Sequence, residues 1–197
     1  MIHSRQRRQI VSITIAAMVL GLLAVAPVAA ASRSHAVAAG SNCVTVIASL
    51  APGETTSKVI SENCAATFAE SIAAATGGAI RLPKGATPRD LASGPLGTLS
   101  QTVLSVDYQH EKENTTQTGW TKTWFSNDSH GCTGGYAYAV STLVGTMYNN
   151  SISSSHAWGG CRAFHYEDPS YGGSVRVCTC WTMGVMNDQT SSLSWEP

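Results

Sequence analysis

The sequence predicts a mainly β protein in which a β-sandwich at the C-terminus follows a small, disulfide-stapled α/β segment. After residue 102, short runs of alternating apolar and polar residues recur, with glycine-rich turns between them. Many short strands at regular spacing are typical of a sandwich. A helical pattern occurs near residues 67–76, and six cysteines are available for disulfides. These observations together indicate the fold class.

The first 30 residues are predicted to be a signal peptide. Three arginines precede an apolar stretch over residues 10–26, and small residues at 28–31 suit signal peptidase. An uncleaved membrane anchor is the alternative, because 17 apolar residues approach the lower limit for a span. We expect a secreted protein with no membrane contact after cleavage. Residues 31–41 are small and polar, as in a disordered leader.

The exported chain would carry nine basic and twelve acidic side chains, a net charge of −3. It contains no run of basic residues, which argues against a nucleic-acid partner. All six cysteines fall in this part, and an even number in an oxidising compartment indicates three disulfides. We expect Cys43 and Cys64 to pair, because no other cysteine occurs before Cys132.

Residues 42–81 are predicted to form the small α/β segment. Residues 44–50 are apolar and end at a Pro-Gly turn, which indicates a strand. Thr67 and Glu70 have the spacing of a capping box, and two glycines end the helix that they would begin. Residues 82–101 are rich in Pro and Gly, so we expect a linker and a domain boundary there.

Residues 102–197 are predicted to form the sandwich. Apolar residues alternate at Leu104, Val106 and Tyr108, which indicates a half-buried strand. Further strands are expected at residues 119–125, 136–140, 161–166 and 174–180. Polar loops separate them, and the longest of these is Lys112–Thr118.

Two polar six-residue segments share one pattern: two amide or carboxylate residues, two free positions and two hydroxyl residues. They are Asn149–Ser154 (NNSISS) and Asn187–Ser192 (NDQTSS). We call them the first and second polar motif. Their oxygen-rich chemistry suits a hard cation such as Ca²⁺. The alternative is that these side chains only cap backbone groups in tight loops.

The second half of the sandwich also contains Tyr166-x-x-x-x-Tyr171-x-Gly173. This pattern resembles the folded-hairpin signature of the βγ-crystallin family, and the two polar motifs resemble its calcium motif. The resemblance implies a two-Greek-key domain, with keys at 102–158 and 161–197. In the first key Tyr108 would open the hairpin without a second aromatic residue, and Trp124 is a rival opening residue.

The resemblance also implies two calcium sites, each shared between the motifs. One motif supplies its third-position carbonyl and fifth-position hydroxyl, and the opposite motif supplies its second-position side chain. The implied ligands are Ser151 and Ser153 with Asp188, Gln189 and Ser191 with Asn150, and the carbonyl of Glu167 with Gln109 as its counterpart. Asp188 is the only carboxylate among the motif ligands. We therefore expect weak binding, with a Kd of about 10⁻⁴ to 10⁻³ M.

The other four cysteines allow more than one pairing. If the strands around residues 166–173 pair about their centre, Cys161 faces Cys178 and Cys132 joins Cys180. The alternative joins Cys161 to Cys180. A Cys178–Cys180 bond is disfavoured because its small ring would be strained.

The sequence contains no HExxH or GxSxG motif, and His165 is expected on the surface. The sequence therefore predicts a secreted, non-enzymatic protein that binds calcium as its cofactor. A proteinase inhibitor or a small cytotoxic protein is the alternative. Secreted bacterial proteins of both kinds resemble βγ-crystallins, and a fold does not fix function. The partner would then be an extracellular protease or a cell-surface component.

Overall fold

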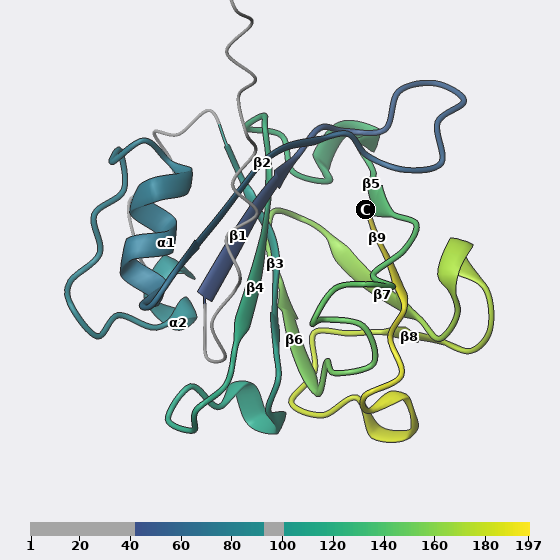
Figure 1. Cartoon of the computed structure of the whole chain (residues 1–197). Coiled ribbons are helices and arrows are strands. Elements are labelled where there is room, and N and C mark those ends of the chain that lie inside the picture. The colour runs from purple at the N-terminus through teal and green to yellow at the C-terminus, as the bar shows by residue number, and fades with distance from the viewer. Residues whose placement is uncertain (1–41, 93–100) are drawn as a thin grey trace, which may run out of the picture. The chain divides into compact units, whose positions relative to one another are not determined.

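The computed structural model describes residues 42–92 and 101–197 (Figure 1). This part of the chain is mainly β, with two sheets and a few short helices, which is consistent with a β-sandwich. The predicted signal peptide and leader lie outside the described residues, as does part of the predicted linker. Within the described ranges, no helix is long and apolar enough to span a bilayer.

Five strands form the larger sheet, in the order β2-β1-β4-β3-β6. Their bounds are β1 Asn42–Ile47, β2 Val59–Ala65, β3 Val103–Tyr108, β4 Thr121–Ser126 and β6 Ser154–Ala157. The smaller sheet has the order β5-β9-β7-β8, with β5 Tyr138–Val140, β7 Arg162–Tyr166, β8 Val175–Val177 and β9 Ser192–Glu196. Neighbouring strands are antiparallel except β1 and β4, which are parallel.

The two sheets exchange segments. Strand β5 lies between β4 and β6 in sequence, but it pairs with β9 in the smaller sheet. In return, the chain after β8 crosses to the larger sheet, where Cys180 forms an antiparallel bridge with Ser155 of β6. Two backbone hydrogen bonds of 2.8 and 3.2 Å make this bridge. Each half of residues 102–197 thus contributes three strands to one sheet and one segment to the other.

Strands β1 and β2 extend the larger sheet, so residues 42–81, the predicted α/β segment, contribute two strands to it. Strand β1 lies along β4 over its whole length, and β2 covers the outer edge of β1. Every residue of β1 after Asn42 is buried. A mostly apolar run such as this one, interrupted only by Thr45, suits a strand that is covered on both faces.

Two α-helices, α1 Phe68–Ala75 and α2 Pro88–Ala92, lie beside the larger sheet (Figure 1). The predicted capping box begins α1, because the Glu70 N–H donates to Thr67 Oγ1 and the Thr67 N–H donates to the Glu70 carboxylate. Phe68 and Ile72 of α1 and Leu91 of α2 pack in one apolar cluster with residues of β1, β3 and β4. The larger sheet is therefore covered on this face by helices.

A second apolar cluster fills the space between the sheets. It contains Trp124 and Trp195, whose ring centroids are 5.2 Å apart. Lys122 points into the same region, with its ammonium 4.9 Å from the Trp124 ring and 4.5 Å from the Tyr148 ring, and it pairs with Glu62. Its side chain is only 3% exposed. Burial lowers the pKa of Lys122 below its ordinary value.

Three disulfides join all six cysteines. The first, between Cys43 and Cys64, links directly paired residues of β1 and β2 and agrees with the expectation from sequence. Disulfides are typical of extracellular proteins.

The other two disulfides differ from the expected pairs. The structure joins Cys132 to Cys161 and Cys178 to Cys180. The predicted pairs Cys161–Cys178 and Cys132–Cys180 are therefore wrong, and so is the alternative Cys161–Cys180. The Cys178–Cys180 bond, which ring strain was expected to disfavour, is present.

The register of the β7–β8 hairpin explains this difference. Phe164 pairs with Val177, and the Cys178 N–H donates to the Ala163 carbonyl at 2.8 Å, so Cys178 lies opposite Ala163 and not opposite Cys161. The chain then leaves this sheet for β6, which takes Cys180 away from β7. Cys132 lies beside Cys161 because its N–H donates to the Gly159 carbonyl at 2.9 Å.

Stability should fall steeply above pH 10. Burial raises the pKa of Tyr108, Tyr138 and Tyr148 well above the ordinary value of 10.0. A tyrosine with a raised folded-state pKa stabilises the fold fully below its unfolded pKa, and this contribution is lost at higher pH. The lowered folded-state pKa of Lys122 makes the fold more stable as the pH rises toward the ordinary value of 10.5. Lys122 therefore does not add to the loss of stability above that pH.

Urea unfolding between pH 8 and about pH 12 tests this prediction, with tyrosinate absorbance recorded at each pH. The unfolding midpoint should drop above pH 10, where these tyrosines ionise in the unfolded chain but stay protonated in the folded one. Tyr148→Phe should reduce the drop, because the Tyr148 hydroxyl has no hydrogen-bond partner among the residues that the structure describes. Normal titration of every tyrosine near pH 10 in the folded protein would contradict the expectation.

Candidate functional site

The two polar motifs lie against each other and are joined through their backbones. The Asn150 N–H donates to the Thr190 carbonyl at 3.0 Å, and the Asp188 N–H donates to the Ile152 carbonyl at 3.1 Å. Both donors have left-handed backbone conformations, with φ of 53° and 55°. Asn and Asp adopt this region more readily than most residues. The loop geometry therefore accounts for the residue types at the second motif position.

Side chains also cross between the motifs. The Ser153 hydroxyl donates to Asp188 Oδ1 at 3.0 Å, and the Ser191 hydroxyl donates to Asn150 Oδ1 at 3.1 Å. The two serines are nearly buried, whereas Asn150 and Asp188 are exposed. The structure thus brings together the fifth-position hydroxyl of each motif and the second-position side chain of the other.

Each motif is anchored to a different hairpin. The Ser153 N–H donates to the Tyr108 carbonyl at 2.9 Å, and the Ser191 N–H donates to the Tyr166 carbonyl at 2.8 Å. The first motif therefore lies next to residue 109 and the second next to Glu167. These are the two positions at which the resemblance implied a ligand carbonyl.

The carbonyls of Gln109 and Glu167 accept no hydrogen bond within the described part of the chain. In a regular ladder each would receive the N–H of the residue opposite, Trp120 or Ser174. The Gln109 and Glu167 side chains take these N–H groups instead, both at 3.1 Å. Hydrogen bonds from Ser174 also lower the pKa of Glu167. Both carbonyls therefore remain available to a further partner.

The residues at the third position of each motif, Ser151 and Gln189, also have carbonyls without a donor in the described part of the chain. The Ser151 hydroxyl donates to the Met147 carbonyl at 2.6 Å, and the Gln189 N–H donates to the Met186 carbonyl at 3.2 Å. Among the described residues, neither the Ser151 carbonyl nor the Gln189 carbonyl accepts a hydrogen bond. Each candidate site thus has two free carbonyls, one hydroxyl and one amide or carboxylate side chain.

The two hairpins share a conformation, which settles where the first one begins. Lys112 and Glu113 have φ of 60° and 52°, and Ser170 and Tyr171 have φ of 57° and 64°. The short 3₁₀ helices Glu111–Glu113 and Pro169–Tyr171 follow Tyr108 and Tyr166 at the same interval. The opening residue of the first hairpin is therefore Tyr108, and the rival Trp124 lies inside β4.

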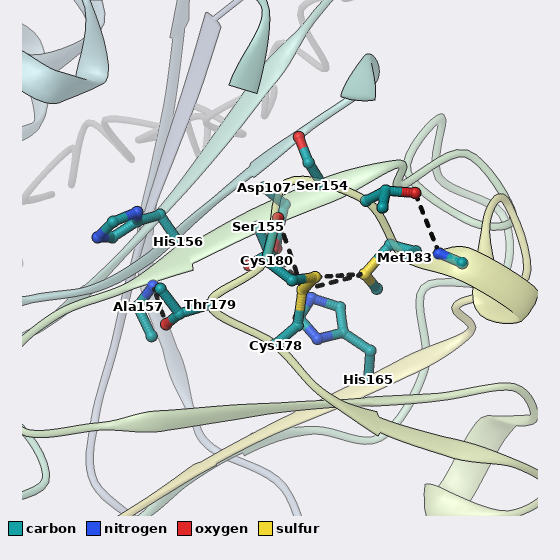
Figure 2. The surroundings of a disulfide bond; sticks show 12 residues. Asp107, Ser154, Ser155, His156, Ala157, His165, Cys178, Thr179, Cys180 and Met183 are labelled. Atoms are coloured by element: carbon teal, nitrogen blue, oxygen red, sulfur yellow. Dashed lines mark hydrogen bonds and ion pairs between the residues drawn. A yellow bond between two sulfur atoms is a disulfide. The ribbon is translucent and has the colours of Figure 1, made fainter. Parts of the chain in front are cut away.

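A buried polar cluster lies between the sheets beside the Cys178–Cys180 disulfide (Figure 2). Asp107 is 0% exposed and accepts hydrogen bonds from the Trp124 indole at 2.8 Å and the Ser155 hydroxyl at 2.6 Å. His165 Nε2 lies 3.1 Å from the same carboxylate. His165 is fully buried, so its expected place on the surface is wrong; it points inward from β7, as Ala163 does.

The buried cluster does not have the arrangement of a catalytic triad. In a triad the histidine lies between the serine and the carboxylate. Here Ser155 and His165 both contact Asp107 Oδ1, and all three side chains are closed to solvent. The geometry is that of a polar link between the sheets.

The structure shows one group of three or more His, Cys, Asp or Glu side chains with metal-ligand spacing among its described residues. It consists of Cys43, Glu62 and Cys64, and its two sulfur atoms form a disulfide. A disulfide offers no thiolate to a metal ion. A cation at the polar motifs would instead be held mostly by hydroxyl, amide and carbonyl oxygens.

Comparison with known proteins finds no relative. No family model matches the chain, and the searches of curated proteins and of solved structures give no match.

Asp107 should be the most sensitive polar residue of the fold. Asp107→Ala leaves three donors without their buried acceptor, so we expect a loss of about 3 kcal/mol or more in unfolding free energy. Ser155→Ala removes one donor and should cost about 1 kcal/mol. Urea unfolding of both variants measures the difference. Equal effects of the two substitutions would show that the carboxylate is not the centre of the cluster.

Proposed function

We propose that the protein is a secreted, non-enzymatic calcium-binding protein of βγ-crystallin type, in which the ions stabilise a two-Greek-key domain at residues 102–197. A Greek key places its four strands in the spatial order 4-1-2-3. The order β6-β3-β4 in one sheet and β9-β7-β8 in the other supports this assignment. The remaining segment of each half, β5 in the first and the stretch at Cys180 in the second, lies in the opposite sheet.

The observation that carries the calcium proposal is the reciprocal contact between the motifs. Ser153 meets Asp188 and Ser191 meets Asn150, at 3.0 and 3.1 Å. Loops that served only as caps would satisfy their own backbone groups. Here four carbonyls near these pairs have no donor among the described residues, and two side chains reach across to the other motif.

The donor set fits calcium and predicts two unequal sites. Calcium takes six to eight oxygen ligands and tolerates carbonyls, hydroxyls and waters. Asp188 supplies a carboxylate to one site, whereas Asn150 supplies only an amide oxygen to the other. The site that includes Asp188 should therefore bind calcium more tightly than the site that includes Asn150. Water would complete the coordination shell of both ions.

Secretion is supported by the three disulfides, which are typical of oxidising compartments. Proteinase inhibition was the alternative, with Lys112–Thr118 as the inhibitory loop. Residues 115–118 are exposed, and the His110 ring contacts the Thr118 carbonyl at 3.0 Å. Such exposure is common to surface loops, whereas the reciprocal contacts between the polar motifs favour calcium binding.

Calcium should raise the melting temperature of the EDTA-treated mature protein. At about 10 mM Ca²⁺ and the expected affinity, one site contributes roughly 1.4 to 2.7 kcal/mol, or about 4 to 8 °C. Asp188→Ala should remove most of this rise, and Asp188→Asn should reduce it without straining the left-handed backbone, because an amide oxygen then replaces the carboxylate, as at the Asn150 site. Asn150→Asp should increase the rise, because it adds a carboxylate to the weaker site.

Glu54→Gln is the matched control, since it removes an exposed carboxylate in a turn outside both motifs. It should leave the calcium-induced rise unchanged. Magnesium at the same concentration controls for ionic strength. The proposal fails if the wild-type protein shows no shift up to about 10 mM Ca²⁺.

A further inference from the structure

The two hairpins differ at one position that their shared conformation makes directly comparable. Tyr171 in the second hairpin packs edge-on against Tyr166, with ring centroids 5.5 Å apart. Its counterpart in the first hairpin is Glu113, whose side chain is only 5% exposed. A buried carboxylate is costly unless it is paired. Glu113 therefore replaces a packing residue with a charge that needs partners.

Glu113 finds these partners outside its own hairpin. Its carboxylate lies 2.9 Å from His156 Nδ1 on β6 and 3.5 Å from Arg89 Nε on α2. The His156 ring packs against Trp158 in a tilted arrangement, with centroids 4.2 Å apart. The buried charge thus fixes Arg89 beside the first hairpin.

A cavity of about 300 Å³ lies between the start of α2 and the first hairpin. Its lining includes Thr87, Arg89, Tyr108, Lys112, Glu113 and Thr116. This volume is at the lower end of the range for small-molecule sites. The second hairpin has Tyr171 where this cavity has the Glu113 carboxylate.

The groups left without partners in this cavity are hydrogen-bond donors. The Tyr108 hydroxyl is buried and has no hydrogen-bond partner in the described part of the chain. Burial and the nearby Glu113 charge raise its pKa, so it remains protonated. Lys112 forms no ion pair with a described residue, and the Arg89 side chain is 63% exposed. Two cations face one carboxylate, which favours an anionic, acceptor-rich ligand.

An exposed tryptophan lies beside Arg89 and Lys112, outside the lining of the cavity itself. Trp181 is 61% exposed, and the Arg89 guanidinium carbon lies 5.9 Å from its ring centroid. The Lys112 N–H donates to the Trp181 carbonyl at 2.5 Å, and Thr182 donates to Glu111, which does not line the cavity, at 2.8 Å. A large flat apolar face next to a cluster of donors can stack on a sugar ring while the donors bind its oxygens.

We propose that this cavity binds a carboxylate-bearing sugar of the uronic acid class. Arg89 and Lys112 bind the carboxylate, and Trp181, which lies beside Arg89, contacts the ring. Glu113 positions Arg89 and does not bind the ligand. The site is separate from the polar motifs and goes beyond the proposed calcium function.

Titration of the full mature protein with D-glucuronate, followed by NMR in EDTA, tests the proposal without calcium. We expect saturable binding in the millimolar range, with shifts of the Trp181 indole resonance. Arg89→Gln and Trp181→Ala should each weaken binding about tenfold or more, and both side chains are exposed enough for the fold to survive. Arg162→Gln, at an exposed arginine on β7, is the matched control and should bind like the wild type.

Two further ligands test the contributions of the sugar ring and of the carboxylate separately. D-glucose has the ring without the carboxylate and acetate has the carboxylate without the ring, so both should bind more weakly than glucuronate. Acetate binding as tightly as glucuronate would overturn the role of the sugar ring. Absence of glucuronate binding up to about 50 mM would overturn the site itself, as would unchanged binding by Arg89→Gln.

Discussion

The buried Asp107 carboxylate is the interaction on which the relative position of the two sheets depends. It accepts hydrogen bonds from Trp124 and Ser155 of the larger sheet and contacts His165 of the smaller one. A second polar link joins the Trp195 indole to the Ser105 hydroxyl at 2.8 Å. Burying a polar group is costly unless it is hydrogen-bonded. These links therefore favour one alignment of the sheets over others that would bury the same apolar surface.

This alignment determines how the two polar motifs meet. Each motif leads into the strand that ends its half, β6 or β9, and the exchange of segments ties both strands to the opposite half. The reciprocal contacts of Ser153 with Asp188 and of Ser191 with Asn150 follow from that exchange. A bound ion would be coordinated by both halves at once. It would therefore oppose their separation, which explains why we expect calcium to act on stability.

The sequence predicted what depends on local patterns and left out what depends on distant contacts. The capping box at Thr67 and the strand that ends at Tyr108 are local, and both are present in the structure; the strand is buried at all six positions, so its expected half-burial is wrong. The parallel pairing of β1 with β4 joins residues almost 80 positions apart, which no local pattern encodes. His165 was misplaced because its polarity indicates the surface, whereas Asp107 gives it a buried partner. The burial of Glu113 and its equivalence to Tyr171 depend on the conformation of the two hairpins, which the sequence does not reveal.

The most direct test of the central claim is the number of calcium ions bound by the mature chain. Each proposed site would take ligands from both motifs, so we expect two ions per chain in a calorimetric titration, the tighter one depending on Asp188. Asn150→Asp should bring the two affinities closer together. A titration without binding heat up to about 10 mM Ca²⁺, or one saturating site that is indifferent to both Asp188 and Asn150, would contradict it.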